Sequence, residues 1–329
     1  MIIGWITPIP IFHGPLTKRF IFITFPAGGE EQPERCPGET GNLRKEPEMK
    51  RLIAVLLAVL LVCALAPAQA LAVETGVEDG VLTIAMECAY APYNWTQGDD
   101  SNGAVPIKDS DSEFANGYDV MMAKKICEAN GWQLEVIKAD WDSLVPGVQS
   151  RTYDAVIAGQ SMTPERSEQV DFAGPYLYAT IVCLTRADSP YASAKGISDL
   201  KGGTCTSQSA TIWYDTMLPQ IPDAKIQPAA ESAPAMLMAL ETGMVDFVCT
   251  DMPTALGAVA AYPDLVLLDF AGSDDDFAAD DGDINIGVSV FKGNTELLDA
   301  INAVLEPMTA DDFNAMMADA IAVQPMSEE

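Results

Sequence analysis

Basic residues and histidine are scarce in this sequence. Its 329 residues contain 18 lysines and arginines against 48 aspartates and glutamates, a formal net charge of -30, and a single histidine, His13. This charge argues against a nucleic-acid partner, because it would be repelled by phosphates. A catalytic triad or a histidine-rich zinc site needs an imidazole. Since we expect His13 to be removed from the working protein, most hydrolase and zinc-enzyme functions are excluded, and we predict no metal and no cofactor.

Paired cysteine motifs are also missing. None of the seven cysteines forms a C-x-x-C pair, so the sequence indicates neither a zinc ribbon nor a disulfide framework. The five cysteines after residue 70 are widely spaced and mostly have apolar neighbours. We expect them to be small buried hydrophobic residues, with one disulfide among them left open. They are Cys88, Cys127, Cys183, Cys205 and Cys249.

The sequence has one long apolar run, at residues 52–66. Met49-Lys50-Arg51 precedes it and Pro67-Ala68-Gln69-Ala70 follows it. A basic start, about 15 apolar residues and an Ala-x-Ala site are typical of a secretory signal, and a membrane span needs about 20 residues. We therefore predict a cleaved signal peptide over 49–70 and export to a periplasm or a cell surface, with a retained anchor as the alternative. Cys63 lacks a small preceding residue, so a lipid anchor is not expected.

Residues 1–48 show no helical or strand periodicity. Lys45-Glu46 can be encoded by a purine-rich ribosome-binding sequence, at a suitable distance from Met49. We interpret 1–48 as an upstream translation, with Met49 as the initiator and 71–329 as the mature protein.

Strand-like and helix-like segments alternate along the rest of the chain, a pattern typical of α/β domains with largely parallel sheets. The length is typical of about two domains. The first series has predicted strands at 81–86, 133–138 and 153–158 and predicted helices at 118–130, which ends at Gly131, and at 141–150. The second has strands at 181–186, 204–207 and 245–250, helices at 197–200, 212–218 and 233–241, and two amphipathic helices at 294–305 and 311–320. Acidic clusters such as Asp99-Asp100 do not match a calcium loop, and we expect solvated surface loops there.

Residues suited to binding a zwitterion follow the ends of these strands. Loops at the carboxyl edges of parallel strands are where open α/β sheets bind ligands. Glu87 and Tyr90 follow the first strand, Trp141 opens a helix, the segment 159–166 follows the strand at 153–158, and Asp251 follows the strand at 245–250. The sequence therefore predicts that these four segments form one ligand site.

The motifs in these segments resemble those of a known family. The chain is similar to the extracellular solute-binding proteins of polar-amino-acid ABC transporters, solute-binding family 3, over nearly all of 78–325. The resemblance rests on the motifs at 90–95 (YAPYNW), 117–120 (GYDV), 141–146 (WDSLVP), 153–159 (YDAVIAG), 163–166 (TPER), 170–172 (VDF) and 174–176 (GPY). Each motif alone is weak, but their order and spacing together are specific.

This resemblance implies an α/β fold, a two-lobed clamshell of the periplasmic-binding-protein type II, with each lobe a mainly parallel sheet flanked by helices. The first lobe is expected to be discontinuous, 78–176 plus 285–329, and the second to span 181–280. Two crossing segments act as the hinge, and the ligand lies in the cleft between the lobes.

The resemblance also implies roles for individual residues. Arg166 is expected to bind the ligand carboxylate through its planar guanidinium. Gly159 and Ser161 match positions that offer backbone and hydroxyl groups to the same ligand. Asp251 matches the acid that binds the α-ammonium, and it also suits a helix N-cap.

The side chain of the ligand is expected to lie between Tyr90 and Trp141, which match an aromatic pair in the family. In the second lobe, Gln208-Ser209-Ala210-Thr211-Ile212 replaces a loop that usually contains a glycine. Thr211 is expected to donate to the carboxylate from a helix start, and Gln208 to lie beside it. The register of this loop stays open by one residue.

The function that the resemblance implies is ligand capture for an ABC transporter, by a monomer that delivers an amino acid to a membrane permease. Two alternatives stay open. One is an enzyme like cyclohexadienyl dehydratase, which uses the same fold and for which Glu87 would be an acid. The other is a sensor domain. Glu87 and Asp251 bring two acids against Arg166, which favours a basic or amide-bearing amino acid over an acidic one.

Overall fold

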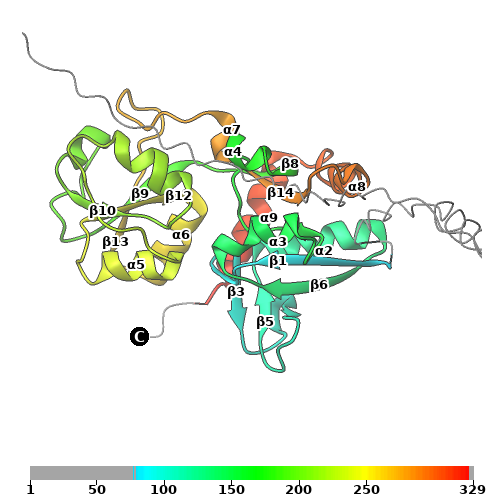
Figure 1. Cartoon of the computed structure of the whole chain (residues 1–329). Coiled ribbons are helices and arrows are strands. Elements are labelled where there is room, and N and C mark those ends of the chain that lie inside the picture. Colours follow the sequence, from blue (N-terminus) through cyan, green and yellow to red (C-terminus); the bar gives the residue numbers. More distant parts are fainter. Residues whose placement is uncertain (1–76, 78, 326–329) are drawn as a thin grey trace, which may run out of the picture. The chain divides into compact units, whose positions relative to one another are not determined.

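The computed structural model describes residue 77 and residues 79–325, which form two lobes (Figure 1). The predicted upstream segment 1–48, the predicted signal 49–70 and His13 and Cys63 within them lie outside the described residues and stay predictions. Within the described ranges, every helix is too short or too polar to cross a membrane. Each lobe is built on a five-stranded sheet.

The sheet of the first lobe has the strand order β6-β1-β7-β14-β8. Its strands are β1 (Val81–Met86), β6 (Gln133–Lys138), β7 (Ala155–Val156), β8 (Val170–Tyr178) and β14 (Asn285–Phe291). The helices of this lobe are α2 (Tyr118–Asn130), α3 (Leu144–Gln149), α4 (Pro164–Ser167), α8 (Thr295–Leu305) and α9 (Ala310–Val323). Helix α2 ends as predicted, because Gly131 takes the left-handed conformation at φ 70° that closes a helix.

The sheet of the second lobe has the strand order β11-β10-β12-β9-β13. Its strands are β9 (Ile181–Arg186), β10 (Thr204–Thr206), β11 (Lys225–Ile226), β12 (Phe247–Asp251) and β13 (Leu265–Leu268). Helices α5 (Ala233–Glu241) and α6 (Met252–Ala261) are capped by Ser232 and Asp251, whose side chains accept hydrogen bonds from the first turn. The apolar faces of both helices pack on this sheet, around Val248 and Leu184.

Each sheet is mixed, with four strands that run in one direction and one that runs against them, so both are mainly parallel, as predicted. In the first lobe β1 pairs in parallel with β6 and β7, whereas β14 pairs antiparallel with β7 and β8. In the second lobe β10 pairs in parallel with β11 and β12, whereas β9 pairs antiparallel with β12 and β13. The reason is the connection between the lobes: β8 leads out of the first lobe and β14 returns into it, so these strands run in opposite directions.

The crossing segments lie side by side. The backbone N–H of Ala179, just after β8, donates to the carbonyl of Ile284, at the end of α7 (Asp281–Ile284). The described residues belong to one compact unit. Because no boundary divides this unit, the predicted division into a first lobe of 78–176 plus 285–329 and a second lobe of 181–280 stays a prediction.

Two predicted helices form as shorter turns. The helix predicted over 141–150 divides into a 3₁₀ turn, Trp141–Ser143, and α3, which contains Pro146. Proline lacks an N–H and is tolerated only in the first turn of an α-helix, so α3 begins just before it. The helix predicted over 212–218 is a wide π turn, Trp213–Met217, followed by a 3₁₀ turn, Leu218–Gln220. A 3₁₀ turn also occupies Ile197–Leu200.

A small antiparallel sheet extends from the first lobe and was not predicted. Its strands are β2 (Ala89–Tyr90), β3 (Asn94–Gln97), β4 (Val105–Pro106) and β5 (Phe114–Asn116), in the order β2-β3-β5-β4. The acidic pair Asp99 and Asp100 is exposed in one of its loops, as expected.

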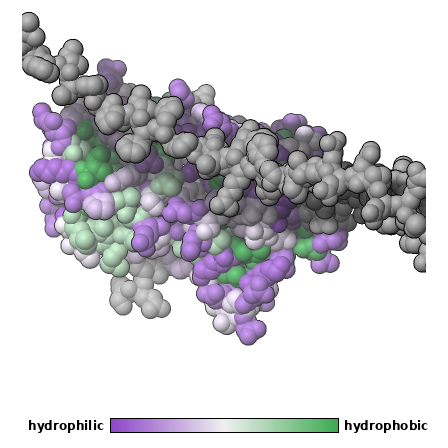
Figure 2. Space-filling model, viewed as in Figure 1, coloured by the Kyte–Doolittle hydropathy of each residue, from purple (hydrophilic) through white to green (hydrophobic). Residues whose placement is uncertain are grey.

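Hydrophilic side chains cover much of the visible face of the described chain (Figure 2). The five cysteines after residue 70 are buried free thiols, which confirms that expectation.

Candidate functional site

The predicted site residues meet in one place. Seven of the nine line a pocket with an empty volume of about 250 Å³: Tyr90, Trp141, Gly159, Ser161, Arg166, Gln208 and Thr211. The other two are bonded to lining residues. Glu87 accepts a hydrogen bond from Nε2 of Gln208 at 3.2 Å, and Asp251 accepts one from the Tyr90 hydroxyl at 2.6 Å. The structure thus brings all nine together from both lobes, while their roles stay predictions.

A larger pocket, with an empty volume of about 1080 Å³, has a mostly apolar lining that includes Trp95, Leu237 and Tyr262. Among the described residues that line it, Lys138 alone carries a charge. A zwitterionic ligand needs partners of both signs. The smaller pocket has Arg166 in its lining and Asp251 bonded to its Tyr90, so it offers both signs of charge, whereas the larger pocket does not.

Arg166 is positioned by the short helix α4. Thr163 caps that helix, accepting from the Arg166 N–H at 3.3 Å, and Pro164 stands at its first position, where the missing N–H costs nothing. The Arg166 guanidinium donates to the carbonyl of Ser161 from Nη1 and to the carbonyl of Ala210 from Nη2, both at 2.9 Å. Burial lowers the pKa of Arg166 to about 10, so the group stays charged at neutral pH.

The aromatic side chains form two walls. The Cζ atom of Arg166 lies 5.5 Å from the centre of the Trp141 ring, within cation–π range. The Tyr90 ring stacks on Tyr93 with centres 4.8 Å apart. Trp141 therefore lies on the guanidinium side of the pocket, and Tyr90 is held by its neighbour and by its bond to Asp251.

Asp251 is buried, with 1% of its surface exposed, and both of its carboxylate oxygens have partners. Oδ1 accepts from the N–H of Thr254 at 2.8 Å and so caps α6, while Oδ2 accepts from Tyr90. Burial raises the pKa of Asp251, and the hydrogen bonds oppose that shift. The helix-cap role considered from the sequence is present, and a carboxylate with four lone-pair positions still has acceptor capacity for a ligand.

Glu87 lies among acidic residues. Burial raises its pKa to about 7, the hydrogen bond from Gln208 opposes this, and the carboxylates of Asp140 and Asp142 raise it further. Sequence reasoning missed these two aspartates, although they flank Trp141 directly. Three acids near one end of the pocket make that end favourable for a cation.

The backbone at Gly159 leaves no room for a side chain. Gly159 has φ 63°, and a Cβ there would lie 2.9 Å from the Tyr90 ring. Its N–H already donates to the hydroxyl of Tyr176 at 3.0 Å. The backbone group that Gly159 has left to offer a ligand is therefore its carbonyl oxygen.

The hydroxyl of Thr211 forms hydrogen bonds within its own turn. Its hydroxyl donates to the carbonyl of Gln208 at 2.7 Å and accepts from the N–H of Tyr214 at 3.4 Å. The hydroxyl thus closes its own turn, and any contact with a carboxylate falls to the backbone N–H. The helix that follows is only the π turn, so it offers little dipole.

Two further residues at the site were not predicted. Trp213 lines the pocket beside Thr211. Ala210 takes φ 53°, a left-handed conformation that favours glycine. Its carbonyl accepts from Arg166 and, at 3.4 Å, from Nε1 of Trp141. The sequence did offer a signal: the loop usually contains a glycine, and a glycine indicates a backbone of unusual conformation.

Comparison with known proteins identifies the family of this chain. The family model of bacterial extracellular solute-binding proteins, family 3, matches residues 82–319. The chain belongs to this family. The resemblance inferred from the motifs is confirmed. Its members act outside the cytoplasm as binding proteins.

This chain spans most of the length of two family 3 relatives that are named for their ligands. The ABC transporter arginine-binding protein 1 of Escherichia coli is 28% identical over 203 residues, 62% of this chain and 80% of the relative. The L-cystine-binding protein TcyA of Bacillus subtilis is 26% identical over 233 residues, 70% of this chain and 77% of the relative. Both relatives are thus named for binding an amino acid, and the first also for an ABC transporter.

Solved structures confirm the clamshell fold of family 3. An amino acid ABC transporter substrate-binding protein from Streptococcus pneumoniae, bound to L-arginine, has a TM-score of 0.63 and 25% identity, over 74% of this chain and 95% of the other. The ancestral amino acid-binding protein AncCDT-1, a precursor of cyclohexadienyl dehydratase, has a TM-score of 0.59 and 25% identity, over 74% and 97%. The predicted two-lobed type II fold is thereby confirmed.

Proposed function

We propose that this protein is the exported substrate-binding component of an ABC transporter, which captures a basic or amide-bearing amino acid between its lobes and delivers it to a membrane permease. The observation that carries the proposal is the joint position of Arg166 and Asp251. Arg166 and Tyr90 line one pocket, and Asp251 is bonded to that same Tyr90. An α-amino acid carries a carboxylate and an ammonium one carbon apart, so it needs partners of both signs at close range.

In this proposal the ligand carboxylate binds the Arg166 guanidinium, with Ser161 and the backbone N–H of Thr211 beside it. Arginine suits this role because its planar fork donates two parallel hydrogen bonds. The ligand ammonium binds Asp251 and the carbonyl of Gly159. The N–H of Gly159 is committed to Tyr176, which leaves an acceptor for the ammonium.

The ligand side chain lies between Tyr90 and Trp141 and extends toward Glu87 and Gln208. Asp140 and Asp142 add negative charge there. A guanidinium, an ammonium or an amide donor is favoured at this end, whereas a further carboxylate would be repelled. The arginine ligands named for the E. coli and S. pneumoniae relatives support a basic ligand.

Closure couples the two lobes through the same groups. Gln208 bonds Glu87, Tyr90 bonds Asp251, and Arg166 bonds Ala210, each across the lobes. A bound ligand would add its own contacts to both sides of this set. We therefore propose that the ligand favours the closed arrangement, because it interacts with more groups there than in an open one.

Export is the second part of the proposal. The signal-peptide anatomy of residues 49–70 supports a periplasmic or cell-surface protein, in agreement with the family. We propose that the protein works as a monomer whose partner is the permease, without a cofactor. A sensor or a dehydratase-like enzyme on this fold would need groups beyond those that bind the amino acid. The relatives are binding proteins.

A thermal-shift screen tests the proposal. Purified protein, dialysed until mass spectrometry shows no bound amino acid, is melted with each of the twenty amino acids. We expect a rise in melting temperature with one or a few basic or amide-bearing amino acids, recovered unchanged after incubation. Twenty flat curves would contradict binding, and conversion of the added amino acid would indicate an enzyme.

A further inference from the structure

The family motif Gly117-Tyr118-Asp119-Val120 lies outside the ligand pocket, at the start of α2. Asp119 has no exposed surface, and two side chains donate hydrogen bonds to its carboxylate. The Nδ2 group of Asn94 donates to Oδ2 at 2.7 Å, and the hydroxyl of Tyr176 donates to Oδ1 at 2.7 Å. A buried carboxylate needs such partners, because without them its desolvation is costly. Its connections show what the arrangement does.

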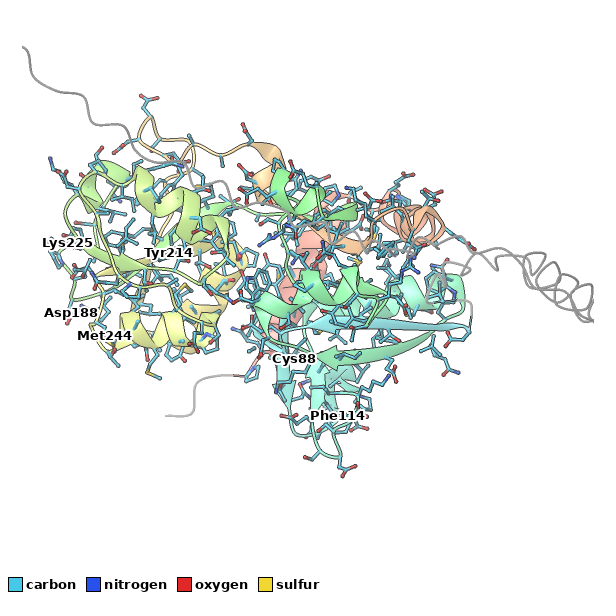
Figure 3. All side chains as sticks on the ribbon, in the orientation of Figure 1. Cys88, Phe114, Asp188, Tyr214, Lys225 and Met244 are labelled. Atoms are coloured by element: carbon cyan, nitrogen blue, oxygen red, sulfur yellow. The ribbon has the colours of Figure 1, made fainter. Side chains whose placement is uncertain are left out.

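Both donors to Asp119 continue into the ligand site. The hydroxyl of Tyr176 accepts from the N–H of Gly159 at 3.0 Å. The Oδ1 atom of Asn94 accepts from the N–H of Cys88 at 2.7 Å. Cys88, labelled in Figure 3, directly follows Glu87. One buried carboxylate is therefore connected by two short chains to two separate segments of the site.

The backbone at these ends needs to be held. Cys88 has φ 54° and Gly159 has φ 63°, both left-handed conformations. Cysteine is unfavourable there, so the hydrogen bond to its N–H stabilises a conformation that the residue would otherwise leave. A backbone hydrogen bond also joins the start of α2 to the segment that follows Cys88: the N–H of Asp119 donates to the carbonyl of Tyr93 at 2.8 Å.

We propose that Asp119 is a positioning residue for ligand binding, which holds Gly159 through Tyr176 and the Glu87–Cys88 turn through Asn94. This inference rests on the proposed function for its effect on affinity. Asp119 itself touches no ligand. Its carboxylate keeps both segments in the geometry that the ligand needs before the ligand arrives, which is how a supporting shell raises affinity.

Substitutions that keep shape but remove one bond test the proposal. Asp119→Asn replaces an acceptor oxygen with a donor, so the donors from Asn94 and Tyr176 no longer both find acceptors. Tyr176→Phe removes the hydroxyl but leaves the bond between Asn94 and Asp119. The control is Asp154→Asn, because the Asp154 carboxylate likewise accepts a hydrogen bond, from the backbone N–H of Thr83 at 2.8 Å, within β1 and away from the residues that line the ligand pocket.

The first readout is amide hydrogen exchange at Gly159 in ligand-free protein. We expect exchange at least several-fold faster in Asp119→Asn and Tyr176→Phe than in wild type, and unchanged in Asp154→Asn, because exchange reports local opening of the hydrogen bond. Equal exchange in all four proteins would overturn the positioning role. This readout needs no ligand, so it decides the inference even where the proposed function fails.

The second readout is the Kd of L-arginine by calorimetry, with the double variant Asp119→Asn/Tyr176→Phe included. We expect Asp119→Asn to bind at least about tenfold more weakly, and the double variant to match Asp119→Asn within about twofold, since residues in one network are not additive. A double variant that loses the product of the two single losses would overturn the chain through Tyr176. Wild-type protein that binds no amino acid would instead refute the proposed function. If Asp119→Asn does not fold, Tyr176→Phe carries both readouts.

Discussion

The Tyr90 hydroxyl donates a hydrogen bond of 2.6 Å to the buried Asp251 carboxylate. Tyr90 lies in β2 of the first lobe, and Asp251 ends β12 of the second, so this contact joins the lobes. The other oxygen of Asp251 caps α6. The acid that we propose for the ligand ammonium is therefore held from both lobes, and its orientation depends on how the lobes meet.

Tyr90→Phe should destabilise the closed protein while keeping the aromatic wall. The substitution takes one donor from a buried carboxylate, and hydrogen bonds to charged groups contribute about 1.5 to 3 kcal/mol. We expect the free energy of unfolding in urea to fall by about that amount. Tyr191→Phe, on a ring that packs against Phe247 in the second lobe, is the control for loss of a hydroxyl. Equal stability of Tyr90→Phe and wild type would show that the bond does not join the lobes.

Arg166→Ala should abolish ligand binding in a folded protein. Truncating one partner of a desolvated charge pair costs about 2 to 5 kcal/mol of affinity, a loss of tens-fold to thousands-fold. Calorimetry with the amino acid found in the thermal-shift screen measures it. The matched control is Arg151→Ala, since Arg151 also lies over an aromatic ring, at 4.0 Å from the centre of Phe291. Near-native affinity in Arg166→Ala would contradict the assignment of the carboxylate.

Glu87→Gln should distinguish a basic ligand from an amide-bearing one. A distal cation would lose a charge-assisted hydrogen bond of about 1.5 to 3 kcal/mol, whereas the amide of glutamine would still find an acceptor. Because the pKa of Glu87 is raised to about 7, L-arginine affinity in wild type should fall as pH is lowered from 8 to 6. That dependence should be weaker in Glu87→Gln. Titrations by calorimetry at both pH values check it, and identical profiles would exclude Glu87 as the partner of the cation.

The same carboxylate should make the ligand-free protein less stable as pH rises. Burial raises the pKa of Glu87 from 4.5 to about 7, so between these values the folded state binds a proton that the unfolded state has lost. Stability from this group is present below about pH 4.5 and is lost toward pH 7, by about 3 kcal/mol in total. Glu87→Gln should therefore raise the melting temperature at pH 8 relative to wild type, and have little effect at pH 4.5.

Glu128→Gln, on the exposed face of α2, is the control for loss of one negative charge from a strongly acidic protein. An equal gain in Glu128→Gln would mean that net charge, rather than the burial of Glu87, accounts for the effect.

Much of the fold could be predicted because its signals are local. Helix α2 and strands β1 and β6 have the predicted bounds, since apolar periodicity and the helix-ending Gly131 lie within a few residues of each other. The small sheet β2-β3-β5-β4 could not be predicted in this way. Its strands are only two to four residues long, so no periodicity develops within any one of them.

The motifs predicted residues that come together at one pocket, but they gave no information on the backbone contacts there. The hydroxyl of Thr211 closes its own turn, and the carbonyl of Ala210 accepts from Arg166. Backbone groups such as this carbonyl have no sequence signature beyond the conformation of the loop. The contacts of Asp119 were equally hidden, because its partners Asn94 and Tyr176 come from segments 25 and 57 residues away.

The most direct test of the central claim is a calorimetric comparison of L-arginine, L-lysine, L-glutamine and L-glutamate on ligand-free wild-type protein. We predict that a basic or amide-bearing amino acid binds most tightly and that glutamate binds most weakly, because Glu87 and Asp251 repel its second carboxylate. The preferred ligand should stabilise the fold by about 2.7 kcal/mol at a hundredfold excess over its Kd. Preferential binding of glutamate, or no heat with any amino acid, would contradict the account.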